Sequence, residues 1–338
     1  MPITMKDIAN DLGVSAATVS KVLRNHSDIG EATRQRVLKR VKELNFHPNM
    51  MARGLVTGRS YLVGLIVPSL FHPFFAEVAK ALSFALGKSG YYLVISSSEE
   101  NPALEERQIN QLLGRGLDAI VVASSCSTPE VFERVRNHGT PFILIDRQFP
   151  DFPTNFVGVD DHAVGLLATE HLISVGCRRI AHVHGPNNSP GLGRLAGYRE
   201  ALAKHGLLAI PEYVVSERKV DIDGTQRGAE ATRILLALQD RPDGIFCHND
   251  PLAIGVIDTI LAAGLRVPED IAVIGCGNLH YDSSLRVPLS SIDQHTSSIG
   301  TRAAKMVLNL ITSKTQTRPK SIVLKPEIVV RASTKIRP

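Results

Sequence analysis

The sequence contains no tryptophan, and aromatic residues make up only 5% of its 338 residues. Neither the four cysteines nor the twelve histidines show the spacing of metal ligands. We therefore predict no metal site and no disulfide framework. We interpret the cysteines as small buried residues of a protein in a reducing compartment. They are Cys126, Cys177, Cys247 and Cys276.

Signals for secretion, membrane insertion and common enzyme chemistry are also missing. No basic and then apolar leader opens the chain, and no uncharged apolar run reaches the roughly 18 residues of a membrane span. The sequence has no Gly-x-Gly-x-x-Gly turn after a first strand and no phosphate-loop lysine. It also has no nucleophile-elbow serine. We expect a cytoplasmic protein that is not an enzyme, needs no cofactor and has no membrane partner.

Positive charge is concentrated at the N-terminus. The chain carries a net charge of +5, and residues 1–60 hold ten lysines and arginines against five aspartates and glutamates. This surplus predicts a polyanion partner for the N-terminal region. The length is sufficient for two or three domains.

Residues 4–23 have the pattern of two short helices joined by a tight turn. Thr4 and Asp7 match a capping box, Gly13 allows the left-handed turn that ends a helix, and Ser15 can cap the next helix. Apolar residues then recur at three- and four-residue spacing. This is the pattern of a helix-turn-helix, although an ordinary helical hairpin also fits it. A third helix over 31–45 completes a small predicted core of Ile8, Leu12, Val14, Val19, Val22, Val37, Val41 and Leu44.

Residues 48–55 have the features of a short hinge helix. Pro48 ends the preceding helix, and Asn49 can cap a new one, in which Gly54 costs about 1 kcal/mol relative to alanine. So short a helix is marginal alone, which suits a segment that DNA must brace, although a plain linker is the alternative. Leu55 is then available to wedge between base steps in a minor groove.

From Tyr61 onward, strands and helices alternate. Residues 62–67 form a continuous apolar run, as expected for a parallel strand covered on both faces. The alternation runs in two series, one ending near residue 146 and one beginning near residue 162, and predicts doubly wound parallel sheets. Two such lobes imply a cleft where their strand ends meet.

Short motifs spread along the chain resemble those of the LacI/GalR family of bacterial transcription regulators. They lie at residues 5–9, 14–15, 18–23, 48–49, 52–55, 72–75, 193–198, 249–250 and 266–275. The resemblance implies an all-α helix-turn-helix headpiece (1–47), a hinge helix and linker (48–60) and a two-lobed α/β core similar to periplasmic binding proteins (61–338). In that fold the chain crosses between the lobes three times. Lobe one is expected at about 61–161 and 294–320, and lobe two at about 162–293 and 321–338.

The resemblance also assigns candidate DNA-binding residues. Base readout falls on Ala16, Ala17 and Lys21. Because alanine makes only apolar contacts with bases, we expect hinge and shape readout to matter. Capping alone is the alternative role for Thr4 and Ser15. The other expected contacts, to phosphates or through the hinge, come from Thr4, Ser15, Thr18, Ser20, Asn25, Arg34, Asn49, Arg53 and Leu55.

A small-molecule effector is expected in the cleft. Aromatic side chains can stack on a ring while polar groups at strand ends bind hydroxyls. Phe71 and Phe74 could instead belong to the lobe core, and Asp146 could cap a local turn. Arg194 is expected on a loop that faces the cleft. By resemblance the candidates are Leu70, Phe71, Phe74, Asp146, Arg147, Arg194, Asn249 and Gly277.

Gly277 departs from the family pattern, because many members carry aspartate there. Loss of that carboxylate removes a charged acceptor for hydroxyls. An unmodified hexose is therefore less favoured as the effector, and an anionic or nucleobase-like ligand gains weight.

The sequence as a whole predicts a regulator, most simply a repressor, controlled by a sugar, a sugar derivative or a nucleobase-like effector. We expect a homodimer, with a tetramer left open, on pseudopalindromic double-stranded operator DNA. Dimer contacts are expected to include the helices that begin near Phe75 and His162. The alternatives are a solute receptor with the same core fold and an α/β enzyme that acts on a phosphorylated small molecule.

Overall fold

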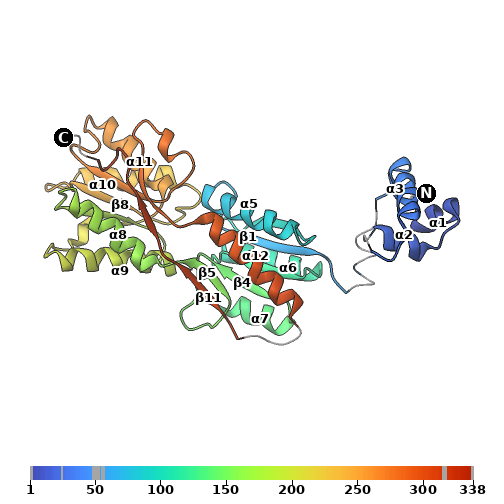
Figure 1. The fold of residues 1–338 in the computed structure, drawn as a ribbon. Helices are drawn as coiled ribbons and strands as arrows, with labels where there is room; N and C mark the ends of the chain where they lie inside the picture. The colour runs from blue at the N-terminus through green and yellow to red at the C-terminus, as the bar shows by residue number, and fades with distance from the viewer. Residues whose placement is uncertain (1–2, 24–25, 48–53, 55–57, 314–317, 336–338) are drawn as a thin grey trace. The chain divides into compact units, whose positions relative to one another are not determined.

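The computed structural model describes residues 3–23, 26–47, 54, 58–313 and 318–335 (Figure 1). The chain divides into two compact units, residues 1–60 and 61–338. Of the predicted hinge helix over 48–55, all but Gly54 lies outside the described residues.

Within residues 3–47, the described part of the N-terminal unit contains the short helices α1 (Met5–Leu12), α2 (Ala16–Leu23) and α3 (Glu31–Glu43). The predicted capping box is confirmed, since the Thr4 hydroxyl accepts from the Asp7 backbone N–H and the Asp7 carboxylate accepts from that of Thr4. Gly13 ends α1 with a φ of 66°. The Ser15 hydroxyl accepts from the Thr18 N–H at 3.0 Å, which confirms the second cap. The predicted core is also confirmed, with Ile8, Val19, Val22 and Val37 buried and Leu12, Val14, Val41 and Leu44 packed against them.

The first sheet of the core unit has the strand order β11-β5-β4-β3-β1-β2, and every pairing in it is parallel. Its strands are β1 (Leu62–Val67), β2 (Tyr92–Ser97), β3 (Ala119–Val122), β4 (Phe142–Ile145), β5 (Phe156–Val159) and β11 (Ser321–Leu324). Side chains alternate between its two faces: Leu65 and Val67 pack beneath α5 (Pro73–Gly87) and α12 (Thr296–Thr312). Ile66 packs beneath α6 (Pro102–Gly114) and α7 (Glu130–His138).

The second sheet has the order β12-β10-β9-β8-β6-β7, parallel except for β12. Its strands are β6 (Ile180–His184), β7 (Val214–Ser216), β8 (Gly244–Cys247), β9 (Ala272–Gly277), β10 (Ser290–Asp293) and β12 (Glu327–Val329). One face is covered by α8 (Asp161–Ser174) and α9 (Ser189–Lys204), the other by α10 (Gly224–Leu236) and α11 (Asp250–Ala262). Two 3-10 turns, η1 (Pro211–Tyr213) and η2 (Asp282–Ser284), lie in connections.

The chain passes between the lobes after β5, after β10 and after β11 (Figure 1). The expected end of lobe one near residue 320 is wrong by one strand. Residues 321–324 pair in parallel with 156–159 and so complete the first sheet, and only β12 returns to the second. The last crossing therefore lies at residues 325–326.

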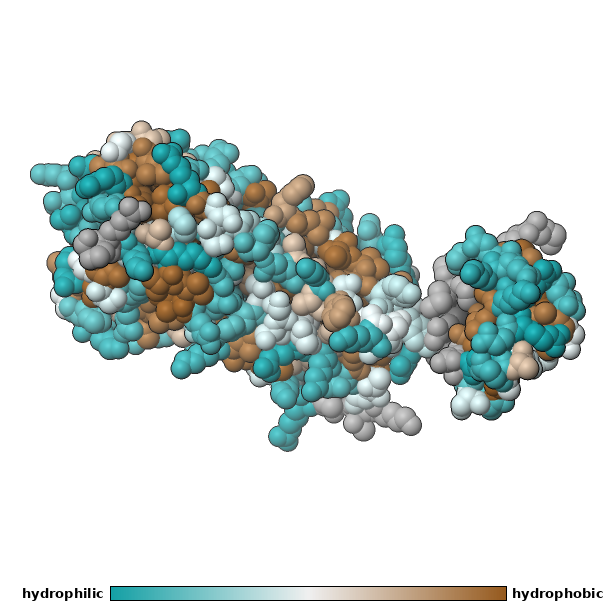
Figure 2. Space-filling view, turned by 45° about the horizontal axis from the view of Figure 1, so that its top comes forward, coloured by the Kyte–Doolittle hydropathy of each residue, from teal (hydrophilic) through white to brown (hydrophobic). Residues whose placement is uncertain are grey.

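Most apolar side chains are buried, but some reach the surface on both lobes (Figure 2). Among the described residues, no helix is long and apolar enough to cross a membrane.

Candidate functional site

The exposed face of α2 carries Lys21 beside Ala17. The Lys21 Nζ lies 2.5 Å from the Asp28 carboxylate, and this hydrogen bond lowers the pKa of Asp28. An exposed ion pair of this kind contributes little to stability. Lys21 can therefore exchange Asp28 for an acceptor on a ligand at little cost.

The arginines of α3 have internal partners. Arg36 donates to the Leu12 carbonyl at 2.9 Å, Arg40 pairs with Asp11 at 2.6 Å, and Arg34 donates to the His26 carbonyl at 2.5 Å. These contacts hold α3 against the rest of the unit. In the free protein, these three arginine side chains therefore stabilise the packing of the helices.

The predicted DNA contacts differ in where they lie. Ala16 packs against the small core, whereas Ala17 is exposed. The hydroxyls of Ser15 and Thr18 bond to each other at 2.9 Å, and Ser20 is half-buried. Asn25, Asn49, Arg53 and Leu55 lie outside the described residues.

In the core unit, the carboxyl ends of strands from both lobes meet at one cleft, as is usual for ligand sites in open α/β sheets. Six residues that are not glycine adopt left-handed backbone angles in the loops that follow these strands. They are Glu99, Glu100, Asp146, Lys219, Asn278 and His295, with φ between 49° and 61°. Such strain concentrates at functional sites.

A buried ion pair joins the lobes across this cleft. Arg147, just after β4, contacts the carboxylate of Asp221 from lobe two through Nη2. Its Nη1 donates to the Ser124 carbonyl at 3.1 Å, and the carboxylates of Glu100 and Asp146 both lie 3.6 Å from the guanidinium. Burial raises the pKa of Asp146 and, with repulsion from Asp221, raises that of Glu100 to about 7. One arginine thus faces three carboxyl groups.

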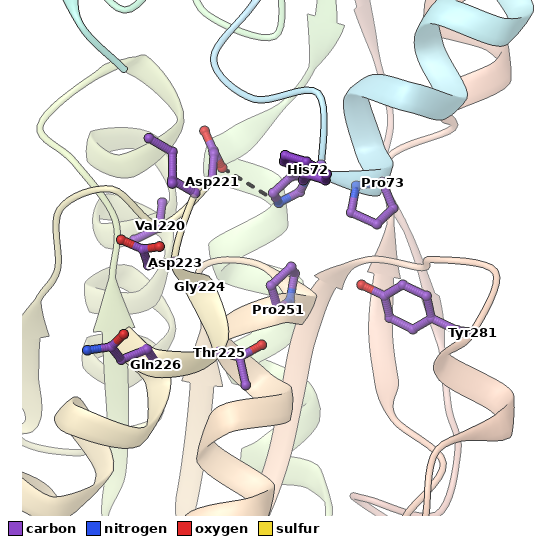
Figure 3. Close-up of a pocket in the computed structure, with 12 residues that line it drawn as sticks. His72, Pro73, Val220, Asp221, Asp223, Gly224, Thr225, Gln226, Pro251 and Tyr281 are labelled. Atoms are coloured by element: carbon purple, nitrogen blue, oxygen red, sulfur yellow. Dashed lines mark ion pairs between the residues drawn. The ribbon is translucent and has the colours of Figure 1, made fainter. Parts of the chain in front are cut away.

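His72 extends this bridge from lobe one. Its Nε2 lies 3.6 Å from the Asp221 carboxylate (Figure 3) and 3.2 Å from Nδ2 of Asn249. Burial lowers the pKa of His72, so its ring is neutral at neutral pH. The Asn249 carbonyl oxygen caps α11 through the Leu252 N–H. The Asn249 side chain therefore contacts both the N-terminus of α11 and His72 of the bridge.

Two chambers lie on either side of the bridge. The smaller, of about 360 Å³, is lined by Phe71, His72 and Pro73 of lobe one and by Asp221, the start of α10, Pro251 and Tyr281 of lobe two (Figure 3). The larger, of about 650 Å³, lies between the loops after β2, β3 and β4 and those after β6 and β7. Residues 219–221 separate the two.

The prediction that Arg194 lies on a loop facing the cleft is wrong. Asn188 caps α9 by accepting from the Gly191 N–H, so the helix begins at Ser189 and contains Arg194. The buried guanidinium donates to the side chains of Asp161 and Gln294, each at 2.9 Å, and to the His248 carbonyl at 2.5 Å. Asp161 and Gln294 lie on two different crossings between the lobes. Arg194 therefore holds the hinge between the lobes.

Gly277 lies against a buried carboxylate. A β-carbon at this position would come within 2.6 Å of Asp250 Oδ2, so any side chain would displace Asp250. That carboxylate accepts from the Ser291 hydroxyl at 2.7 Å and from the Leu279 N–H at 3.3 Å. The Asp250 carboxylate is thus buried, and neither it nor Gly277 lines either chamber.

The other predicted effector contacts divide between core and surface. Phe74 belongs to the core of lobe one, which was the alternative interpretation. Phe71 is 93% exposed and lines the smaller chamber, so the core interpretation is wrong for it. Leu70 is also exposed, but it lines neither chamber.

Several residues of the cleft were not predicted. The buried carboxylate of Glu105 accepts from the Ser124 hydroxyl at 2.6 Å and the Ser125 N–H at 2.5 Å, and so shapes the loop after β3. Polar serines directly after a buried strand were an available signal. Asp221 lies in a segment without motif or periodicity, and no local signal points to it.

Comparison with known proteins places these features in a family. A model described as bacterial regulatory proteins, lacI family, matches residues 4–49, and one described as periplasmic binding protein-like domain matches 169–334. The chain is 31% identical over 336 residues to the HTH-type transcriptional repressor PurR of Pasteurella multocida, covering 99% of each protein.

Solved structures share the whole architecture. The transcriptional regulator CelR in complex with cellobiose is 29% identical, covers 98% of this chain and 99% of its own, and has a TM-score of 0.74. The Lac repressor dimer bound to operator and the anti-inducer ONPF is 24% identical, covers 99% of each chain and has a TM-score of 0.82, a similarity of fold. The chain therefore belongs to the LacI family of bacterial regulatory proteins, as a DNA-binding transcription regulator under effector control.

Proposed function

We propose that this regulator is a repressor that binds pseudopalindromic operator DNA as a homodimer and is controlled by a metabolite held between its lobes. The observation that carries the proposal is the cleft itself. Strand ends from both lobes meet at the Arg147–Asp221 bridge, with a chamber on either side. A ligand there changes contacts of both lobes at once, and such coupling typically changes affinity at a second site by about 1–3 kcal/mol.

On the DNA side, we assign base contacts to Ala17 and Lys21 of α2. The exchangeable Lys21–Asp28 pair supports this role. We also propose Leu55 as the minor-groove wedge and Asn49 and Arg53 as further DNA contacts, three residues that lie outside the described part of the chain. The protein would act in the cytoplasm, where operator DNA lies.

Exposed apolar side chains on lobe one support a homodimer. Phe84 of α5 is 70% exposed and Tyr92 of the edge strand β2 is 66% exposed. The Lac repressor of similar fold is described as a dimer on its operator. We propose that α5 and β2 lie in the subunit interface. Phe84→Asp should then shift the chain toward monomers in sedimentation velocity, whereas Leu208→Asp on lobe two is the control.

The proposal is tested by selecting duplexes from a random library with the full-length protein and then measuring affinity by fluorescence anisotropy. Leu55→Ala should weaken the selected duplex far more than random DNA, because only a bent site accommodates the wedge. The affinity should also fall steeply with salt as phosphate contacts release counterions. Equal losses on both duplexes would refute the wedge.

Failure to select any duplex would overturn the repressor and favour a solute receptor with the same core. Turnover of a phosphorylated compound by the protein would favour the enzyme instead.

A further inference from the structure

More basic than acidic residues line the larger chamber. Three basic residues line it, Arg147, Arg218 and Lys219, against one acidic residue, Glu100. Neither Arg218 nor Lys219, both exposed, forms an ion pair or a side-chain hydrogen bond with any residue that the structure describes. The remaining polar lining comes from serines, asparagines and a glutamine, which are neutral hydrogen-bonding groups.

Two buried polar atoms at this chamber have no hydrogen-bond partner in the described part of the chain. They are Nε of Arg147 and Oε1 of Glu100, whose side chains are only 8% and 9% exposed. Buried polar groups are normally satisfied. The Arg147 Nε–H is a charged donor that is held in place by Asp221 and the Ser124 carbonyl. Its nearest acidic neighbour, the Asp146 carboxylate, lies 3.6 Å away, which leaves Nε without a hydrogen bond in the described part of the chain.

The smaller chamber has the opposite character. Its lining includes Asp221 and Asp223 but no lysine or arginine, together with Phe71, Pro73 and Tyr281 (Figure 3). An anionic group is repelled there and attracted to the larger chamber. An apolar or hydroxylated ring is accommodated between the exposed Phe71 and Tyr281.

We propose that the effector carries an anionic group, a phosphate or a carboxylate, that binds in the larger chamber to Arg147 Nε, Arg218 and Lys219. This inference rests on the proposed function, since it names the chemistry of the ligand that controls the regulator. Charge-assisted hydrogen bonds to guanidinium and ammonium groups are among the strongest available to such a ligand. Burial and repulsion from Asp221 raise the pKa of Glu100 to about 7, so this carboxyl group accommodates an anion by taking up a proton.

The test is titration calorimetry of the full-length protein with four probes: inorganic phosphate, citrate, glucose 6-phosphate and glucose. The variant is Arg218→Gln with Lys219→Gln, because glutamine keeps a side-chain stem and meets the same backbone strain as lysine at position 219. The matched control is Arg302→Gln with Lys305→Gln, which removes two exposed charges from α12.

We expect phosphate, citrate or both to bind, and the chamber variant to weaken binding at least about tenfold, equivalent to 1.4 kcal/mol. The control should bind as the parent does, and glucose should bind more weakly than glucose 6-phosphate. Stronger binding of phosphate than citrate identifies a phosphate ester, and the reverse identifies a carboxylate. Failure of both anions to bind at about 10 mM, or equal losses in both variants, would overturn the proposal.

DNA selectivity measured on the same preparations separates the two proposals. Retained operator binding with no anion binding refutes only the anionic effector. Loss of sequence-selective DNA binding in the parent protein refutes the repressor, whatever the anions do.

Discussion

Asp282→Asn should stabilise the core unit, and increasingly so as the pH rises. Asp282 and Asp250 are both fully buried, and the two oxygens of Asp282 have no hydrogen-bond partner in the described part of the chain. Burial and the charge of Asp250 raise the pKa of Asp282 to about 9, while burial raises that of Asp250 to about 6. At neutral pH, Asp282 is therefore protonated and Asp250 ionised. Asparagine is neutral at every pH and keeps a donor toward Asp250.

The magnitude follows from linkage. A group whose pKa is raised on folding binds more protons in the native state than in the unfolded state. Its contribution to stability is therefore complete below the pKa of the unfolded state. That contribution is lost as the pH rises toward the pKa of the folded state. With an unfolded pKa of about 3.9, the loss at pH 7 is about 4 kcal/mol, or about 1.4 kcal/mol for each pH unit. The substitution removes that loss. The Tm difference between variant and parent should therefore grow by roughly 6–8 °C between pH 4 and pH 7.

The assay is thermal unfolding at pH 4 to 8, followed by circular dichroism because the chain has no tryptophan. Asp270→Asn is the control of opposite sign. Hydrogen bonds from Arg266 lower the pKa of Asp270 to about 2, so its stabilisation is present above pH 4 and lost in acid. If the difference between Asp282→Asn and the parent were the same at every pH, the buried acid pair would be refuted.

Three further outcomes are expected. Asp28→Asn should bind operator about 2–5-fold more tightly in anisotropy titrations, because Lys21 no longer gives up a charged partner when it contacts DNA; unchanged affinity would contradict a base contact by Lys21. Arg194→Lys should lower stability in urea unfolding by about 2–4 kcal/mol, since an ammonium group cannot satisfy the bonds to both lobe crossings and the His248 carbonyl; a wild-type midpoint would refute the hinge role. Ser15→Ala should cost the N-terminal unit about 1 kcal/mol through loss of its cap, and an unchanged melting curve would refute it.

Local interactions explain why the N-terminal unit was predictable. Caps such as those of Thr4 and Ser15 act within three residues, and the apolar spacing that builds a helix face repeats within two turns. Most core strands were found for a similar reason, because an apolar run such as 62–67 signals burial on both faces. Arg194, expected on a loop, lies in α9 because the cap of Asn188 starts that helix at Ser189.

The amino-acid sequence by itself determined the helix-turn-helix, the alternation of strands and helices and the presence of a cleft, because these follow from neighbours along the chain. Only the tertiary structure decided which groups meet in that cleft. The bridge from Arg147 to Asp221 spans 74 residues, and Arg194 reaches 100 residues to Gln294. Strand 321–324 likewise joins lobe one by pairing with 156–159. Such contacts depend on the path of three lobe crossings, which no local spacing encodes.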